Sequence, residues 1–174
     1  MKSGSRLSAE VFIGLGGNLG EVRATFEKAL QKLEGFSQVK KLSSLYRSKP
    51  YGFEDQPDFL NAAALIATEL EPLPLLAELQ AIENELGKQV IRENGPRAID
   101  LDLLFYADLA FKTDELEVPH PGIAERDFVL APLAELDPDF IHPVLGRGIG
   151  QLLSACPGGY VVEAVGEFTP PRAG

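Results

Sequence analysis

The sequence predicts a single α+β domain built on an antiparallel or mixed sheet. Two patterns indicate this. Apolar runs over 11–15 and 98–106 have the length of strands, whereas apolar residues recur at helical spacing over 22–33 and 75–86. These segments do not follow the regular strand–helix–strand order that a parallel α/β sheet requires. The 174 residues are the length of one domain.

The first third of the chain contains strand, helix, strand and loop in that order. Residues 11–15 are expected to form a buried strand that ends at Gly16-Gly17-Asn18, a sequence typical of a tight loop. A helix over 22–33 follows. A second strand is expected over 39–46, and a loop containing two prolines and a glycine over 47–58.

Residues 59–70 fit either a helix, because of their alanines, or a buried strand. The next segment is a clear helix, which begins near Pro72 and Pro74 and ends at Gly87. The remaining elements are a polar loop, a strand with a turn at Ala107-Asp108, a short helical stretch and a last strand, over 87–96, 98–106, 123–136 and 160–165.

Composition argues against several classes of protein. No apolar run approaches the roughly 20 residues of a membrane span, and residues 1–10 lack the apolar stretch of a signal peptide. A net charge of −10 argues against nucleic-acid binding. Cys156 is the single cysteine, which fits a reducing cytoplasm, and we expect it to be buried. We expect a domain over 11–165, with flexible ends over 1–10 and 166–174.

Two aspartates mark the most informative segment. Side chains alternate faces along a strand, so Asp100 and Asp102 share one face while their neighbours form an apolar face. A bound divalent cation would remove the repulsion between the carboxylates, and Mg²⁺ prefers one or two carboxylates together with phosphates and water. The spacing alone also fits a strand face that is simply solvated.

Basic residues near the aspartates favour an anion-and-metal site. Arg97 follows Gly95-Pro96, and its guanidinium can bind a phosphate through two hydrogen bonds. Lys88 and Arg92 lie in the preceding loop, and Arg126 follows later. Each alone would be an ordinary surface cation, but together with the aspartates they indicate bound phosphate.

Five motifs occur in a fixed order and spacing along the chain. They are residues 14–19, 45–48 with 55–63, 95–104, 118–120 and 126–128. Together they resemble the 6-hydroxymethyl-7,8-dihydropterin pyrophosphokinases of folate biosynthesis, and the resemblance covers nearly the whole chain. It implies a ferredoxin-like α/β/α sandwich with a mainly antiparallel central sheet, in which 59–70 is a strand.

The resemblance also implies a reaction, in which diphosphate passes from ATP to the dihydropterin and AMP is released. Asp100 and Asp102 would bind two Mg²⁺ ions, with Asp100 also near the pterin as the nearest candidate for a base. Arg92 and Arg97 would assist catalysis, and Lys88 and Arg92 would lie on a mobile loop that closes over the phosphates. The residues implied for pterin binding are Ser48, Lys49, Tyr51, Phe59, Asn61 and Phe128. Those implied for ATP binding are Gln80, Glu83, Lys88, Arg97, Leu103, His120 and Arg126. No obligate protein partner is implied.

The residue types implied for pterin binding suit a flat ring with polar edges. Such a ring needs aromatic faces, which Phe59 and Phe128 would supply, and an amide that both donates and accepts, which Asn61 would supply. Plain core packing is the alternative for the two phenylalanines, and an ordinary turn residue is the alternative for His120.

The polar loop departs from the family's usual pattern. Members commonly have basic residues at the positions of Val90 and Glu93 and often an aromatic one at Asn94, and some have an aromatic residue at Pro121. These departures concern loop closure and adenine contacts, while the aspartate pair is intact. Two other functions fit parts of the pattern. One is a nucleotide-sugar glycosyltransferase, for which 174 residues are few, and the other is a non-catalytic pterin or nucleotide binder.

Overall fold

The computed structural model describes residues 8–52, 54–87 and 97–166. The elements are β1 (Ala9–Gly17), α1 (Val22–Leu33), β2 (Ser37–Leu42), β3 (Leu45–Ser48), β4 (Phe59–Thr68), α2 (Pro72–Glu85), β5 (Asp100–Tyr106), β6 (Phe111–Lys112), β7 (Glu117–Val118), the 3₁₀ helix η1 (Ile123–Glu125), α3 (Asp127–Leu136), α4 (Ile149–Ala155) and β8 (Val161–Gly166). Six strands form one sheet in the order β5-β1-β4-β3-β8, with β2 also paired to β4, and β6 and β7 form a separate ribbon. Every described strand pair is antiparallel.

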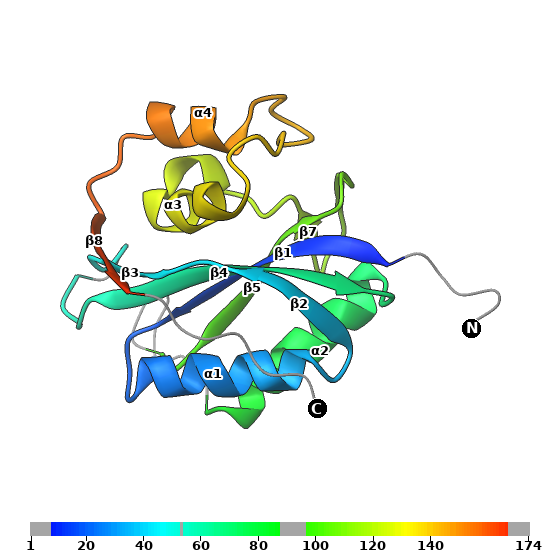
Figure 1. Ribbon diagram of the computed structural model, residues 1–174, viewed down its shortest axis with the longest axis horizontal. Coiled ribbons are helices and arrows are strands. Elements are labelled where there is room, and N and C mark those ends of the chain that lie inside the picture. Colours follow the sequence, from blue (N-terminus) through cyan, green and yellow to red (C-terminus); the bar gives the residue numbers. More distant parts are fainter. Residues whose placement is uncertain (1–7, 53, 88–96, 167–174) are drawn as a thin grey trace.

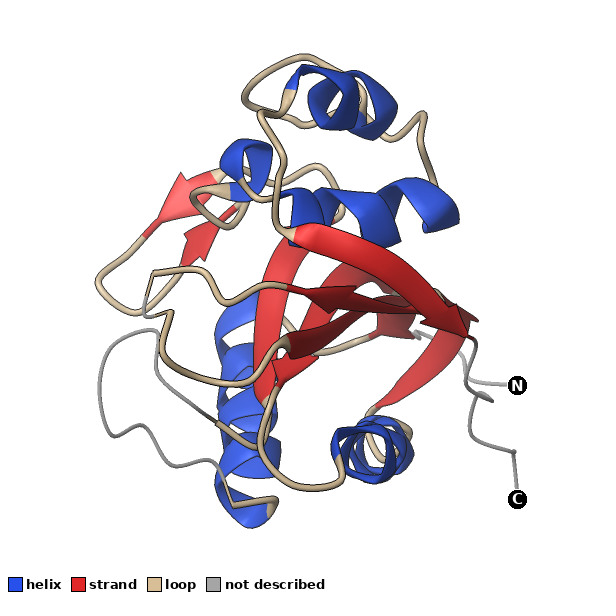
Figure 2. Ribbon diagram, turned by 90° about the vertical axis from the view of Figure 1, so that its left-hand side faces the viewer, coloured by secondary structure: helices blue, strands red, loops and turns tan. Residues whose placement is uncertain are grey.

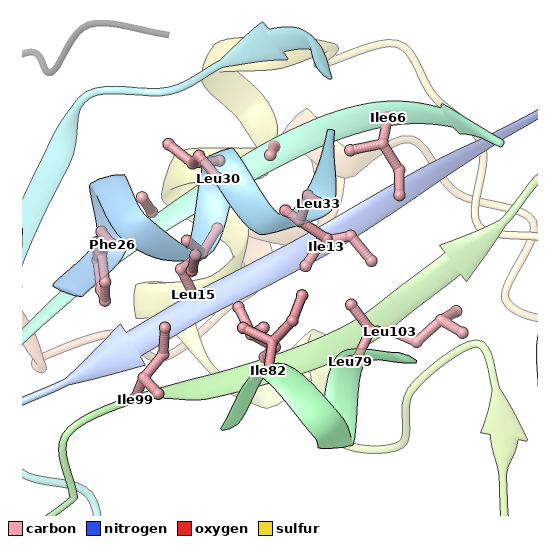
Figure 3. Packing of buried hydrophobic residues seen from close by; sticks show 14 of the residues in the cluster. Ile13, Leu15, Phe26, Leu30, Leu33, Ile66, Leu79, Ile82, Ile99 and Leu103 are labelled. Carbon is pink, nitrogen blue, oxygen red and sulfur yellow. The ribbon is translucent and has the colours of Figure 1, made fainter. Parts of the chain in front are cut away.

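Helices cover both faces of the sheet, which confirms the expected α/β/α sandwich. In Figure 1 α3 and α4 lie above the sheet, whereas α1 and α2 lie below it; Figure 2 shows the same layers from the side. The strand β1 contributes side chains to the cores on both faces of the sheet, because successive side chains of a strand point to opposite faces. Ile13 and Leu15 pack with Phe26 and Leu30 of α1 (Figure 3), while Phe12 packs on the α3 side.

The strand expected over 39–46 is wrong as a single element, because the chain breaks into β2 and β3 at Ser43-Ser44. The Ser43 amide donates to the Ala63 carbonyl, and the Ser43 hydroxyl oxygen accepts from the Ala63 amide, both at 2.9 Å. The Ser43 hydroxyl thus replaces a backbone carbonyl as the acceptor for the Ala63 amide. Leu42 pairs with Ala64, whereas Tyr46 pairs with Asn61. The segment from Leu42 to Tyr46 is therefore one residue longer than the part of β4 that it pairs with, as in a β-bulge.

Other differences from the expected elements are small. The strand expected over 98–106 begins at Asp100, and the left-handed backbone of Ala107 (φ 48°) confirms the turn that follows it. The helix α4 and the ribbon of β6 and β7 were not predicted. Cys156 is half-buried at the edge of the α3-side core, so the expectation that it is buried is wrong. Among the described helices, none has the length and apolar character needed to cross a membrane.

His142 gives the fold a testable pH dependence. Its side chain is 6% exposed, and Nδ1 accepts hydrogen bonds from the amides of Val144 and Leu145, both at 3.1 Å. Burial lowers the pKa of His142 from its ordinary value of 6.5. The folded state therefore binds this proton less readily than the unfolded chain, and stability present above the unfolded pKa is lost as pH falls towards the folded pKa.

We expect His142→Asn, which keeps an acceptor but does not titrate, to lose less stability than the unmodified protein between about pH 7 and pH 5. Urea unfolding at a series of pH values measures this. Equal losses in the two proteins would show that His142 is not the group responsible.

Candidate functional site

A cavity lies at one end of the sheet, where β1 and β3 end and β4 and β5 begin. The antiparallel register brings these four ends together: Gly16 pairs with both Asn61 and Asp100, and Gly14 with Asp102. Residues from the start of α3 complete the wall, so the cavity lies on the α3 side. The polar ends of separate strands thus meet at one place.

Two glycines keep the floor of this cavity open. A Cβ at Gly16 would lie 3.2 Å from Asn61 Oδ1, and one at Gly14 would lie 3.2 Å from a methyl group of Leu104. Any larger residue at either position would press on these neighbours. The absence of side chains at Gly14 and Gly16 leaves space beside the carboxylates of β5.

Asp100 and Asp102 share one face of β5 and both line the cavity, as the alternation predicted. Leu101 and Leu103 face the opposite way and are buried against α1 and α2. Arg97 Nη1 lies 2.6 Å from Asp100 Oδ2, with side chains 15% and 21% exposed respectively. The strand therefore presents two carboxylates and an adjoining guanidinium to one space.

Asn18 fixes the segment that carries Arg97. Its Oδ1 accepts from the Arg97 amide at 3.0 Å, and its own amide N–H donates to the Arg97 carbonyl at 3.0 Å. Its side-chain nitrogen donates to Gln56 Oε1 and to the Pro57 carbonyl, each at 2.9 Å. Asn18 thus joins the loop before β4 to the residues before β5. It was not among the predicted site residues, because only the folded chain brings these segments together.

All six residues predicted to bind pterin line this one cavity, namely Ser48, Lys49, Tyr51, Phe59, Asn61 and Phe128. Asn61 is 8% exposed, and its Nδ2 donates to the Ser48 hydroxyl at 2.7 Å. The ring centroids of Tyr51 and Phe128 are 5.6 Å apart. The cavity therefore combines aromatic faces with an amide held in place.

Arg126 lines the same cavity from the start of α3. Its guanidinium carbon lies 5.1 Å from the centroid of the Tyr51 ring, a cation–π contact. Its Nε is buried and has no hydrogen-bond partner among the described residues. Burying such a donor is costly unless a ligand or water accepts from it. Arg126 is thus equipped to bind an acceptor within the cavity.

The residues predicted to bind ATP are less completely assembled. Leu103 and His120 line a second recess of about 350 Å³, and Asp102 lines both this recess and the cavity. The side chain of Leu103 is only 3% exposed. Gln80 is exposed on α2 and lines neither space.

Glu83 also lines neither space. It is buried and accepts from the Leu101 amide at 2.7 Å, so it holds β5 in place. Lys88 and Arg92, and the departures at Val90, Glu93 and Asn94, lie outside the described residues.

The sequence is similar to those of known proteins. A sequence model of the 7,8-dihydro-6-hydroxymethylpterin-pyrophosphokinase (HPPK) family matches residues 12–138. A 2-amino-4-hydroxy-6-hydroxymethyldihydropteridine pyrophosphokinase of Aquifex aeolicus is 43% identical over 143 residues, covering 82% of this chain and 89% of that protein. One of the same name from Pseudomonas aeruginosa is 43% identical over 149 residues, covering 84% and 91%.

A solved structure supports the fold independently of sequence. Wild-type HPPK-DHPS of Plasmodium falciparum matches with a TM-score of 0.70 at 16% identity, over 88% of this chain and 45% of that one. The present chain thus spans less than half of that longer protein. The family match over residues 12–138 and the two relatives at 43% identity show that the chain belongs to the 7,8-dihydro-6-hydroxymethylpterin-pyrophosphokinase family.

Proposed function

We propose that the cavity binds the dihydropterin and that the recess beside Asp102 receives ATP. The reaction of the family is the transfer of diphosphate from ATP to 6-hydroxymethyl-7,8-dihydropterin in folate synthesis, and this chain is an enzyme of that kind. The observation that carries the site assignment is that one cavity contains all six expected pterin-binding residues together with both aspartates. The single cysteine supports a cytoplasmic location as part of the proposal.

For the pterin, we assign the ring faces to Phe59 and Phe128 and the polar edge to Asn61. Both phenylalanines are half-buried in the cavity wall, so each retains surface for a ligand. The bond from Asn61 to Ser48 fixes the amide and leaves Oδ1 near the glycine floor. A fixed amide loses little freedom when a ligand binds, which favours affinity. Lys49 and Tyr51 would complete the rim.

For the metal, we assign two Mg²⁺ ions to Asp100 and Asp102. No cluster of three or more metal-binding side chains occurs within the described residues. Two carboxylates on one strand face nevertheless suit Mg²⁺, which takes its remaining ligands from phosphate and water. Bound there, the ions would neutralise charge on the triphosphate.

For the reaction, we propose that the pterin hydroxymethyl oxygen attacks the β-phosphorus of ATP. The new oxygen–phosphorus bond forms as the bond from that phosphorus to the α–β bridging oxygen breaks. AMP leaves with the bridging oxygen, and we assign Asp100 as the carboxylate that receives the hydroxyl proton. We propose that the chain contributes mainly by orienting the two substrates, with Arg97 and Arg126 of the cavity wall binding the phosphates where ATP meets the pterin. Arg92 and Lys88 keep the roles predicted from the sequence.

Replacing Phe128 with alanine tests the pterin assignment. We expect pterin binding to weaken by about 1–3 kcal/mol, through lost stacking and apolar contact, with little change for ATP. Calorimetric titration with each ligand measures both effects. The matched control is Phe36→Ala, which removes another half-buried ring, one that packs on the α1-side core. A similar loss of affinity for both ligands in Phe128→Ala would mean that Phe128 serves only as a core residue.

A further inference from the structure

Tyr160 lies behind the cavity and does not line it. Its ring centroid is 5.2 Å from that of Tyr51 and 6.0 Å from that of Phe128. Because Tyr51 and Phe128 also contact each other at 5.6 Å, the three rings form a closed cluster. Two members of the cluster belong to the cavity wall, so the third supports them from outside. The family match ends at residue 138, before this segment.

The backbone of Tyr160 forms hydrogen bonds with both segments that carry its ring partners. Its carbonyl accepts from the Lys49 amide at 2.7 Å, two residues before Tyr51. The amides of Tyr160 and Val161 donate to Asp127 Oδ2 at 3.2 and 3.1 Å, and Asp127 directly precedes Phe128. Tyr160 therefore joins the loop after β3 to the start of α3 through both its backbone and its ring.

Asp127 supplies a charged acceptor to this attachment. Its side chain is 7% exposed, and a buried carboxylate that accepts two amide bonds is hard to displace. It also lies in the first turn of α3, where the helix dipole favours negative charge. Gly158 and Gly159 have φ values of 73° and 96°, a left-handed turn that favours glycine and brings the chain to this carboxylate.

The strand β8 extends the same attachment. It pairs with β3, beside which it lies at the end of the sheet (Figure 1). Arg47 of β3 lies 2.8 Å from Glu163 and 2.7 Å from Asp58, which precedes Phe59. These side chains are each more than a third exposed, so the ion pairs contribute little to the stability of the attachment. The partly buried contacts of Tyr160 with Asp127 and with the other two rings therefore contribute most to the attachment.

We propose that Tyr160 is a positioning residue for the dihydropterin: it holds in place Phe128, proposed as one face of the pterin site, and Tyr51, proposed for the rim of that site. This inference rests on the proposed function of the cavity. Two aromatic side chains that are free to change rotamer must be ordered when a flat ligand enters, and this ordering lowers affinity. Tyr160 fixes both before the ligand arrives.

The test compares Tyr160→Ala with Tyr160→Phe in the full chain. We expect Tyr160→Ala to raise the pterin dissociation constant about five- to tenfold and to leave that for ATP unchanged. Tyr160→Phe should restore binding, because no hydrogen bond of the Tyr160 hydroxyl occurs among the described residues. Val162→Ala, at an exposed site in the same segment, is the control and should bind as the unmodified protein does.

A second variant tests whether Tyr160 acts through its attachment to Asp127. Asp127→Ala should also weaken pterin binding, and hydrogen exchange should speed up at the amides of Tyr160 and Val161. If both residues act through one attachment, the double variant with Tyr160→Ala should lose less affinity than the sum of the two single losses.

Three outcomes would overturn the inference: unchanged pterin affinity in Tyr160→Ala, equal losses for pterin and ATP, or failure of Tyr160→Phe to restore binding. Absence of pterin binding by the unmodified protein would instead overturn the proposed function.

Discussion

Replacing Asp102 with asparagine is expected to reduce turnover by at least about a hundredfold, the scale of removing one strong electrostatic stabiliser. Asparagine keeps the shape of the side chain but removes its charge. Asp102 lines both the cavity and the recess proposed for ATP, so its charge lies where the two substrates meet. The measurement is kcat at saturating ATP, pterin and magnesium.

The control is Asp108→Asn, the same change at an exposed position just beyond the other end of β5. We expect it to retain normal turnover. If Asp102→Asn were equally active, the proposed magnesium site would be wrong, even though the fold and the family would stand.

Gly17→Ala should destabilise the fold at the end of β1. A Cβ at Gly17 would overlap the carbonyl oxygen of Ala98 and lie 3.1 Å from its carbonyl carbon. Both are backbone atoms, so the end of β1 would have to separate from the segment before β5. We expect a loss of about 1–3 kcal/mol in the free energy of unfolding, as for other overpacked sites. Activity should fall as well, because the segment carrying Arg97 would shift.

Gly150→Ala is the matched control for that prediction. A Cβ there would lie no closer than 3.4 Å to any neighbour, and the site is helical, where alanine is favoured. Denaturant unfolding of both variants gives the comparison. Equal stability of Gly17→Ala and the unmodified protein would show that the backbones at Gly17 and Ala98 are not held together as described.

Local patterns were enough to predict most of the elements that build the site. The alternation in β5 predicted that Asp100 and Asp102 share a face, because strand geometry requires nothing beyond neighbouring residues. The division of 39–46 into two strands could not be predicted in this way. It depends on the Ser43 hydroxyl meeting the amide of Ala63, twenty residues further along the chain.

The parts of the site that sequence reasoning missed are held by contacts between distant segments. Asn18 bonds to residues near positions 56 and 97, and no local pattern marks it as the connection between them. Tyr160 was predicted only to begin a last strand. Its importance comes from the pairing of β8 with β3 and from the carboxylate of Asp127, neither of which has a periodic signature.

The measurement that tests the central proposal most directly is the identity of the nucleotide product. A kinase that transfers the γ-phosphoryl group alone releases ADP, whereas attack at the β-phosphorus releases AMP. The protein is incubated with ATP, magnesium and 6-hydroxymethyl-7,8-dihydropterin, and the nucleotides are separated by chromatography. We predict AMP and the pterin diphosphate in equal amounts, formed only when both magnesium and the pterin are present. ADP as the main product, or no nucleotide turnover with both substrates present, would contradict the account.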